Sequence, residues 1–272
     1  MSETGSECEL IEEAKLSRGP MTRHRRSSIV DIVQERGAAR VDELAEMFQV
    51  SEVTIRNDLV LLERDGLLAR DRGGAVTTSQ LTTLLGFSQR ATLNRDEKRR
   101  IGKAAAAMVS PGDTIILDAG TTVVEMVRFL DTITPLTVVT NAFNVVAELN
   151  ALPEIEIIFL GGVVNRTASS TLGGLAEQAL SGLVVQKAFL GTQALDAKFG
   201  LTDTTMEIAE VKRAMIAASR QTILLTDSSK WGHAGLVKVA PLSSMQTVIT
   251  DSAIAPDART AIEQTCDEVV VV

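Results

Sequence analysis

The segment from Ser51 to Leu62 limits the possible folds of this chain more than any other part of the sequence. Its apolar residues recur at the i, i+4, i+7 spacing of one helix face, and they are Ile55, Leu59 and Leu62. The opposite face carries Val53 and Asn57, with Thr54 and Arg56 on the flanks. Ser51 stands at the position of a helix N-cap. The pattern predicts a short helix that packs with one face and leaves the other free for recognition.

A second short helix is predicted directly before this one, over Val41 to Phe48, with about three residues between the two. Two short helices at this spacing are typical of a helix-turn-helix, whose second helix enters the major groove of DNA. An earlier helix, Arg23 to Arg36, adds apolar residues to the same core and ends at Gly37. After Gly66, an extended run and the turn at Arg72-Gly73-Gly74-Ala75-Val76 indicate a basic hairpin. The sequence therefore predicts a winged helix-turn-helix over residues 22–77.

A net charge of −8 is unfavourable for a DNA-binding protein, so contacts to phosphates must come from a local cluster of basic residues. Arginines do gather in the predicted first helix, recognition helix and wing. The alternative for each arginine is that it lies in solvent or pairs with a nearby carboxylate. The residues predicted to contact DNA are Arg25, Arg26, Ser51, Val53, Thr54, Arg56, Asn57, Arg72 and Gly73.

The 272 residues are enough for a winged helix and one further domain of about 180 residues. We expect a disordered acidic tail over 1–21, the winged helix over 22–77, a linker over 78–95 and the second domain over 96–272. In the second domain, short runs of Val, Ile and Leu alternate with helices, which predicts an α/β domain with a mainly parallel sheet. The expected strands are Thr114–Leu117, Leu136–Val139, Ile155–Leu160, Lys187–Leu190, Thr222–Leu225, Thr247–Thr250 and Glu268–Val272, and helices are expected over Asp96–Val109 and Pro256–Gln264.

Small and hydroxyl-bearing residues follow the predicted strands, and ligands of an open parallel sheet bind at these carboxyl ends. Ala119 to Thr122 lies where a helix begins, so backbone N–H groups and two hydroxyls converge on a point suited to a phosphate. The alternative is that Thr121 or Thr122 only caps that helix. The residues predicted to bind an effector are Asp118, Ala119, Gly120, Thr121, Thr122, Thr140, Asn141, Gly161, Gly162, Gly191, Asp196, Lys212 and Lys230.

The charged members of this set have alternatives. Lys212 could hold a phosphate, or it could be an exposed helical charge that pairs with Glu207 or Glu210. Lys230 could hold the phosphate or be a charge of a polar loop. Asp118 and Asp196 could accept hydrogen bonds from sugar hydroxyls, or Asp118 could fix its own turn.

The chain has only two histidines and two cysteines, which exclude several classes of site. We find no metal-ligand cluster, no Ser/His/Asp grouping, no disulfide framework and no motif for a cofactor. The acidic N-terminus is unlike a signal peptide, and no apolar run approaches the ~18 residues of a membrane span. We therefore expect a cytoplasmic protein without a membrane partner.

Two sets of motifs resemble one family. Arg25, Ile29 and Val33, followed by S-x-x-T-I-R-N-D-L from Ser51, resemble the helix-turn-helix signature of the DeoR family of bacterial sugar-responsive transcriptional regulators. Asn57 stands where many members carry a second basic residue. The runs D-A-G-T-T, T-N, L-G-G, F-L-G-T-Q-A-L-D, G-L-T, E-V-K-R-A-M-I and D-S-S-K-W resemble the effector domain of the same family, which is similar in fold to ribose-5-phosphate isomerase.

The resemblance implies a repressor of carbohydrate metabolism genes that binds double-stranded operator DNA and is controlled by a phosphorylated sugar. A single winged helix reads few base pairs, so we expect a homo-oligomer, a dimer or tetramer, with the apolar residues of the linker as a candidate contact. Two alternatives are an isomerase-like enzyme that uses Asp118, Asp196 and Lys212, and a winged helix that binds only other proteins. We expect that the chain is not an enzyme.

Overall fold

A computed structural model describes residues 22, 24–33, 36–64, 67–71, 73–76 and 87–272. The chain divides into two compact units, residues 1–81 and 82–272. Several predictions lie outside the described residues, namely the tail over 1–21, the residue Gly66, the wing residue Arg72 and the first half of the linker, 78–86.

The first unit is a winged helix-turn-helix, as predicted. Its described elements are a helix over 24–33, β1 (Ala38–Arg40), α2 (Val41–Met47), α3 (Glu52–Arg64), β2 (Ala69–Asp71) and β3 (Gly74–Val76). The strands form an antiparallel sheet in the order β1-β3-β2. Side chains from each helix and from the start of the wing, including Ile29, Leu44, Ile55, Leu59 and Leu68, are almost fully buried in one core. The sequence pattern did not predict β1, because three residues are too few to show a strand period.

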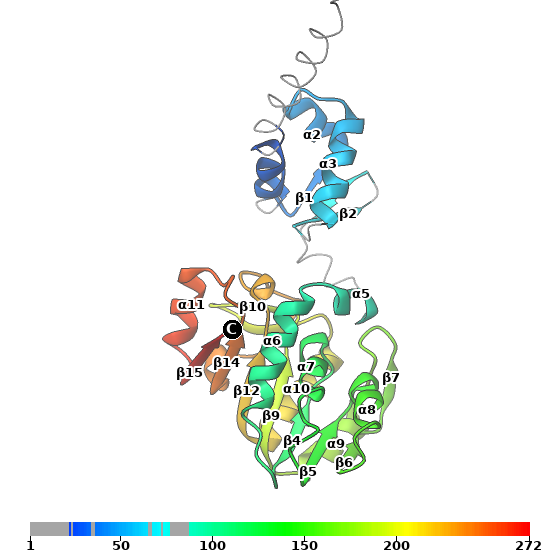
Figure 1. Ribbon diagram of the computed structural model, residues 1–272, viewed down its shortest axis with the longest axis vertical. Helices are drawn as coiled ribbons and strands as arrows, with labels where there is room; N and C mark the ends of the chain where they lie inside the picture. The colour runs from blue at the N-terminus through cyan, green and yellow to red at the C-terminus, as the bar shows by residue number, and fades with distance from the viewer. Residues whose placement is uncertain (1–21, 23, 34–35, 65–66, 72, 77–86) are drawn as a thin grey trace, which may run out of the picture. The chain divides into compact units, whose positions relative to one another are not determined.

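The second unit is built around a seven-stranded sheet (Figure 1). Its strands are β4 (Thr114–Leu117), β5 (Leu136–Thr140), β6 (Ile155–Phe159), β9 (Val185–Gly191), β12 (Ser219–Leu225), β14 (Thr247–Thr250) and β15 (Glu268–Val271). They pair in the order β15-β14-β12-β9-β4-β5-β6, and every pair is parallel. The predicted α/β fold with a mainly parallel sheet is therefore confirmed.

Helices cover both faces of this sheet, and the residues of strand β4 show why. Ile115 and Leu117 belong to one buried cluster, with apolar residues of α6 (Arg95–Ala106), α7 (Thr121–Val127) and α8 (Phe143–Leu149). Ile116 belongs to another cluster, with residues of α9 (Gly174–Ser181) and α10 (Met206–Ala218). Successive residues of a strand point to opposite faces, so an uninterrupted apolar strand needs a cover on each side. The helices are α5 (Phe87–Thr92), α6 (Arg95–Ala106), α7 (Thr121–Val127), α8 (Phe143–Leu149), α9 (Gly174–Ser181), α10 (Met206–Ala218) and α11 (Pro256–Glu263), with short 3-10 helices η1 (Ser228–Lys230) and η2 (Leu242–Ser244).

Two small antiparallel elements complete the unit and were not predicted. The hairpin of β7 (Val163–Asn165) and β8 (Ser170–Leu172) follows β6. A second sheet, in the order β10-β11-β13, is formed by β10 (Ala194–Asp196), β11 (Gly200–Asp203) and β13 (Val237–Ala240). Each strand has only three or four residues, so its alternation is too short to identify from sequence. Both elements nevertheless bring residues to the site described below.

Candidate functional site

The recognition helix α3 presents the face that the sequence predicts. Ser51 is its N-cap, since its Oγ accepts a hydrogen bond from the Thr54 backbone N–H at 3.2 Å. Val53 is 62% exposed although it is apolar, and Asn57 is also exposed. The flanking Arg56 lies in solvent and forms a 2.6 Å ion pair with Glu52, one turn earlier on the same helix. An exposed face with these residues has no internal packing role and is available to DNA.

Arg25 and Arg26 are both engaged inside the first unit. The Nε atom of each donates to a different carboxylate oxygen of Asp58, at 2.7 Å in both cases. Asp58 lies on α3 and is only 2% exposed, while the two arginines are partly buried. These contacts tie the helix over 24–33 to the recognition helix. Both arginines are therefore paired with a carboxylate, which is the alternative stated for them in the sequence analysis. Contact of either residue with DNA stays a prediction.

The wing is described except for its tip at Arg72. Gly73 is exposed and has a φ of 86°, a left-handed conformation that favours glycine. At Gly74 a Cβ atom would lie 2.3 Å from the carbonyl oxygen of Ala39 in the neighbouring strand β1, so only glycine permits this close pairing. The two glycines thus shape the hairpin.

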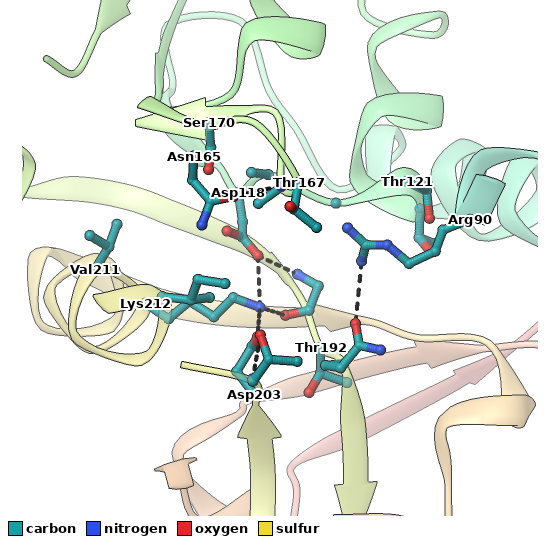
Figure 2. A pocket seen from close by; sticks show the side chains of 18 of the residues that line it. Arg90, Asp118, Thr121, Asn165, Thr167, Ser170, Thr192, Asp203, Val211 and Lys212 are labelled. Atoms are coloured by element: carbon teal, nitrogen blue, oxygen red, sulfur yellow. Dashed lines mark hydrogen bonds and ion pairs between the residues drawn. The ribbon is translucent and has the colours of Figure 1, made fainter. Parts of the chain in front are cut away.

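In the second unit a cavity of about 290 Å³ opens at the carboxyl ends of neighbouring strands (Figure 2). This volume is near the lower end of the range of small-molecule sites, roughly 300 Å³ and above. Strands β5, β4, β9 and β12 are adjacent in the sheet, so the residues that follow them meet here. Nine of the predicted residues line the cavity, namely Asp118, Ala119, Gly120, Thr121, Thr122, Asn141, Gly191, Lys212 and Lys230.

Lys212 has a different role from either of those considered in the sequence. Its Nζ atom donates to the Gly191 carbonyl at 2.7 Å and lies 2.9 Å from Asp203 and 3.3 Å from Asp118 (Figure 2). An ammonium group has three donors, and these contacts use all three. Burial alone would lower the pKa of Lys212, but the Asp118 and Asp203 carboxylates outweigh burial, so the pKa is raised and the group stays charged. The pairing with Glu207 or Glu210 is wrong, and Lys212 has no spare donor for a phosphate.

The residues at the start of α7 line the cavity. Gly120 is the N-cap, and Thr121 and Thr122 are the first two residues of the helix, so the reading in which a threonine caps α7 is wrong. The backbone of Gly120 is extended, and a Cβ atom there would make ordinary contacts. Glycine at this position is therefore not required by the fold itself.

Two cations that line the cavity have no carboxylate oxygen at ion-pair distance within the described part of the chain. Burial lowers the pKa of Lys230, and the neighbouring Arg90 lowers it further, although Asp227 acts in the opposite direction. Burial also lowers the pKa of Arg90, against the attraction of Asp203 and Asp118. Burial therefore disfavours the charged form of both groups, and an anion bound close to them would favour that form.

Four predicted residues do not line the cavity, and each has another contact or position. Thr140 is fully buried and donates its hydroxyl to the Leu117 carbonyl at 2.7 Å. At Gly162 a Cβ atom would lie 2.5 Å from the Leu172 carbonyl oxygen, so this glycine serves the packing of β8. Gly161 precedes it outside the cavity lining. Asp196 closes the turn between β10 and β11 by accepting from the N–H groups of Lys198 and Phe199.

Sequence reasoning missed several lining residues because their elements were not predicted. Arg90 comes from α5, inside the segment interpreted as a linker, and its guanidinium points into the cavity (Figure 2). Asn165, Thr167 and Ser170 come from the β7–β8 hairpin, and Asp203 ends β11. The isolated arginine at 90 in a Ser- and Thr-rich stretch was the one available signal.

Several lining side chains carry buried polar atoms with no hydrogen-bond partner in the described part of the chain. They are Nε of Arg90, Oδ1 of Asn141, Oγ of Ser170 and Nε2 of Gln193. A buried polar atom without a partner costs about 1–3 kcal/mol, so a cluster of four needs an explanation. A polar ligand in the cavity would supply both donors and acceptors.

Other kinds of site find little support among the described residues. No group of three or more His, Cys, Asp or Glu side chains there is placed to hold a metal ion. Burial raises the pKa of the Cys266 thiol to about 11, so the thiolate nucleophile is disfavoured at neutral pH. No helix in the described part of the chain is long and apolar enough to cross a membrane.

Comparison with known proteins gives matches to both units. The DeoR-like helix-turn-helix domain matches residues 25–87, and the DeoR C terminal sensor domain matches residues 93–252. The uncharacterized HTH-type transcriptional regulator YulB of Bacillus subtilis is 41% identical over 239 residues, which cover 88% of this chain and 92% of YulB. The transcriptional repressor AccR of Agrobacterium fabrum is 36% identical, over 89% of this chain and 93% of AccR.

Among solved structures, ribose 5-phosphate isomerase A of Methanocaldococcus jannaschii is similar with a TM-score of 0.38 and 19% identity. The similarity covers 51% of this chain and 55% of the isomerase. The relatives that match along nearly their whole length are regulators, and this chain is accordingly a non-enzymatic regulator. With both of its domains matched, the chain belongs to the DeoR family of transcriptional regulators, and its second unit is the sensor domain of that family.

Proposed function

We propose that this protein is a sequence-specific repressor of carbohydrate metabolism genes and that a phosphorylated sugar in the sensor cavity controls its binding to operator DNA. The observation that carries the proposal is the cavity lining, in which Arg90 and Lys230, without a carboxylate at ion-pair distance in the described structure, and unpartnered buried polar atoms face the same space. Such groups are satisfied by a small ligand that has both negative charge and hydroxyl groups.

The lining differs from one part of the cavity to another in a way that fits this ligand. Arg90 lies beside Thr121 at the start of α7, while Asn165 and Ser170 come from the β7–β8 hairpin (Figure 2). A phosphate is suited to the start of α7, with Lys230 as a further cation. Amide and hydroxyl groups such as those of Asn141, Asn165 and Ser170 are suited to sugar hydroxyls.

Calorimetry with a panel of sugar phosphates, each beside its unphosphorylated sugar, tests this assignment. The phosphorylated member of one pair should bind more tightly, and Thr121→Val or Thr122→Val should weaken it roughly ten- to hundred-fold, since a hydrogen bond to a charged group contributes about 1.5–3 kcal/mol. Thr114→Val is the matched control, because Thr114 begins β4 at the strand end away from the cavity. Equal affinity for both sugars of every pair would refute the phosphate site.

The DNA-binding half of the proposal is supported by the exposed face of α3. A mobility shift with the protein's own upstream DNA should show specific binding that Arg56→Ala weakens by about 1–3 kcal/mol while the fold remains intact. Unchanged affinity of Arg56→Ala would show that α3 does not lie in the major groove as proposed. Such a regulator would act in the cytoplasm, where it meets the chromosome.

The proposed working form is a dimer or a larger homo-oligomer, because one recognition helix contacts too few base pairs to select an operator. The predicted contact through the linker rests on Leu81, Leu84 and Leu85, which lie outside the described residues, and on Phe87. Light scattering with and without operator DNA tests this part. A monomer in both conditions at micromolar concentration would refute it.

A further inference from the structure

The segment over residues 87–98 fastens the start of the sensor domain to the lining of its cavity. It comprises α5, the turn at Asn94 and the first residues of α6. Its contacts to lining residues are Phe87 N–H to the Thr167 carbonyl at 3.1 Å, Arg90 Nη1 to Gln193 Oε1 at 3.3 Å and Asn94 Nδ2 to Asp227 Oδ1 at 3.0 Å. We call residues 87–98 the strap. In the sequence the strap is the described part of the sensor domain nearest to the winged helix.

Arg90 is the central residue of the strap, and its backbone carbonyl is held by a lysine of α6. Lys98 is 3% exposed, and its Nζ atom donates to the Arg90 carbonyl at 2.6 Å. This hydrogen bond fixes the backbone of Arg90 relative to α6. A contact made by the guanidinium therefore also restrains the backbone of the strap, because the Arg90 carbonyl is hydrogen-bonded to Lys98 of α6.

The side chain of Arg90 has an unsatisfied hydrogen-bond donor at the cavity. Its only described side-chain hydrogen bond is the one to Gln193 Oε1, while its Nε atom and the Gln193 Nε2 atom are buried without partners. Gln193 is 8% exposed and lines the same cavity. These are two buried N–H donors, on side chains already in contact, and an anionic oxygen is the acceptor that suits both.

We infer that Arg90 and Gln193 bind the anionic group of the ligand and that this contact tightens the strap, which is how occupancy of the cavity is communicated toward the winged helix. The inference rests on the proposed function, in which the cavity binds a phosphorylated sugar. In the ligand-free protein the strap is held by a few hydrogen bonds, and within the described residues none of them joins Arg90 to an anionic group. A bound phosphate adds hydrogen bonds between opposite charges at Arg90, so it orders the strap without any need for a large movement.

Hydrogen exchange of the full-length protein, with inorganic phosphate as the probe and chloride at matched ionic strength as the reference, tests the inference. Peptides that cover 87–98 should exchange more slowly in phosphate, and peptides that cover 118–124 should report occupancy of the cavity independently. Arg90→Gln should abolish the effect on the strap and weaken phosphate binding roughly tenfold or more. Arg95→Gln is the matched control, since Arg95 has the same charge, lies in the same strap and is exposed.

A second variant protects the test against a misfolded Arg90→Gln protein. Gln193→Glu places a carboxylate against the Arg90 guanidinium, so it should slow exchange of the strap in the absence of phosphate and also weaken phosphate binding. In this variant the strap resembles that of the ligand-bound protein, and operator affinity should no longer respond to the sugar phosphate that binds the wild type.

The possible failures are distinguishable. If phosphate protects 118–124 but leaves 87–98 unchanged, the cavity binds the anion and the role of the strap is refuted. If phosphate protects neither region, the anion site of the proposed function itself is refuted. If Gln193→Glu exchanges at 87–98 as fast as the ligand-free wild type, the Arg90–Gln193 contact does not order the strap, and the inference is again refuted.

Discussion

The two units contain opposite versions of the same charge arrangement. In the winged helix, one buried carboxylate, Asp58, holds two arginines, whereas in the sensor domain one buried ammonium, Lys212, holds two carboxylates. The two arrangements differ in burial. The arginine side chains are 17% and 35% exposed, whereas the Asp118 and Asp203 side chains are 4% and 7% exposed. We therefore expect the sensor-domain cluster to depend far more on its central charge, because its outer members cannot turn to solvent.

Removal of Lys212 should have the largest effect. Lys212→Met leaves Asp118 and Asp203 buried close to each other without a cation, and breaking a buried pair of this kind costs about 3–5 kcal/mol of unfolding free energy. Urea denaturation of the full chain measures the loss in the sensor-domain transition. The exposed Lys103 on α6 provides the control, since Lys103→Met should have little effect. Adding Asp203→Asn to Lys212→Met should recover part of the loss, and a strictly additive double variant would contradict the cluster.

The next largest effect concerns a buried lysine that has no carboxylate at ion-pair distance in the described structure. Burial lowers the pKa of Lys98 from 10.5 to about 8, only partly opposed by Asp227, whereas the pKa of Lys212 is raised. Between pH 8 and 10.5 the unfolded chain then binds more protons than the folded one, so stability rises with pH in this window. The full difference corresponds to about 3 kcal/mol, as an order of magnitude.

Thermal unfolding of the wild type and Lys98→Met at several pH values between 7 and 10 measures this effect. The wild type should gain stability relative to the variant as the pH rises through about 8, and the cost of the buried ammonium should be fully present below that pH. The hydrogen bond lost in the variant adds a constant offset. Parallel pH profiles of the two proteins would mean that Lys98 is not desolvated as its surroundings indicate.

Asp58 should matter less than Lys212, although it is equally buried. Asp58→Asn removes the charge between Arg25 and Arg26, but both arginines can reach solvent, so we expect a loss of about 2 kcal/mol, below the usual range for a buried pair. Hydrogen exchange of α3 amides measures it in the full chain. The exposed pair of Arg40 and Asp42 supplies a control in the same unit, where Asp42→Asn should leave exchange unchanged. If Asp58→Asn lost as much stability as Lys212→Met, the exposure of the outer residues would not determine how strongly a cluster depends on its central charge.

The charge clusters also show how far the sequence could be interpreted. Strands Thr114–Leu117 and Thr247–Thr250 have the predicted bounds, because burial on both faces gives consecutive Val, Ile and Leu residues and not an alternation. Recognition-helix residues such as Val53 and Asn57 are exposed as predicted, because helical period fixes which face is buried. Local pattern determines both results.

Pairing between distant residues is what the local pattern could not provide. Asp58 lies 33 residues from Arg25, and Lys212 lies 94 residues from Asp118, so neither contact has a sequence period. The sequence consequently predicts Lys212 as a phosphate ligand or a surface charge, and nothing in the local pattern indicates Asp203. Arg90 could not be predicted for a related reason. It lies on the short helix α5, whereas the other residues of the cavity come from position 118 onward in the chain.

The smallest expected effect concerns Glu52, whose pair with Arg56 is the exposed counterpart of the buried clusters. Both side chains are at least half exposed, and an i,i+4 pair of this kind contributes about 0.3–0.5 kcal/mol, so Glu52→Gln should hardly change stability.

The effect of Glu52→Gln on operator affinity should have the opposite sign from that of Arg56→Ala. In the complex, a DNA phosphate or base would replace Glu52 as the partner of Arg56, and the carboxylate would repel the phosphates. Glu52→Gln should therefore raise operator affinity about twofold, as measured by filter binding at low salt, and the gain should shrink as salt is added. A lower affinity would mean instead that Glu52 orients Arg56 in the complex, so that this exposed pair, like the two buried clusters, has a positioning role.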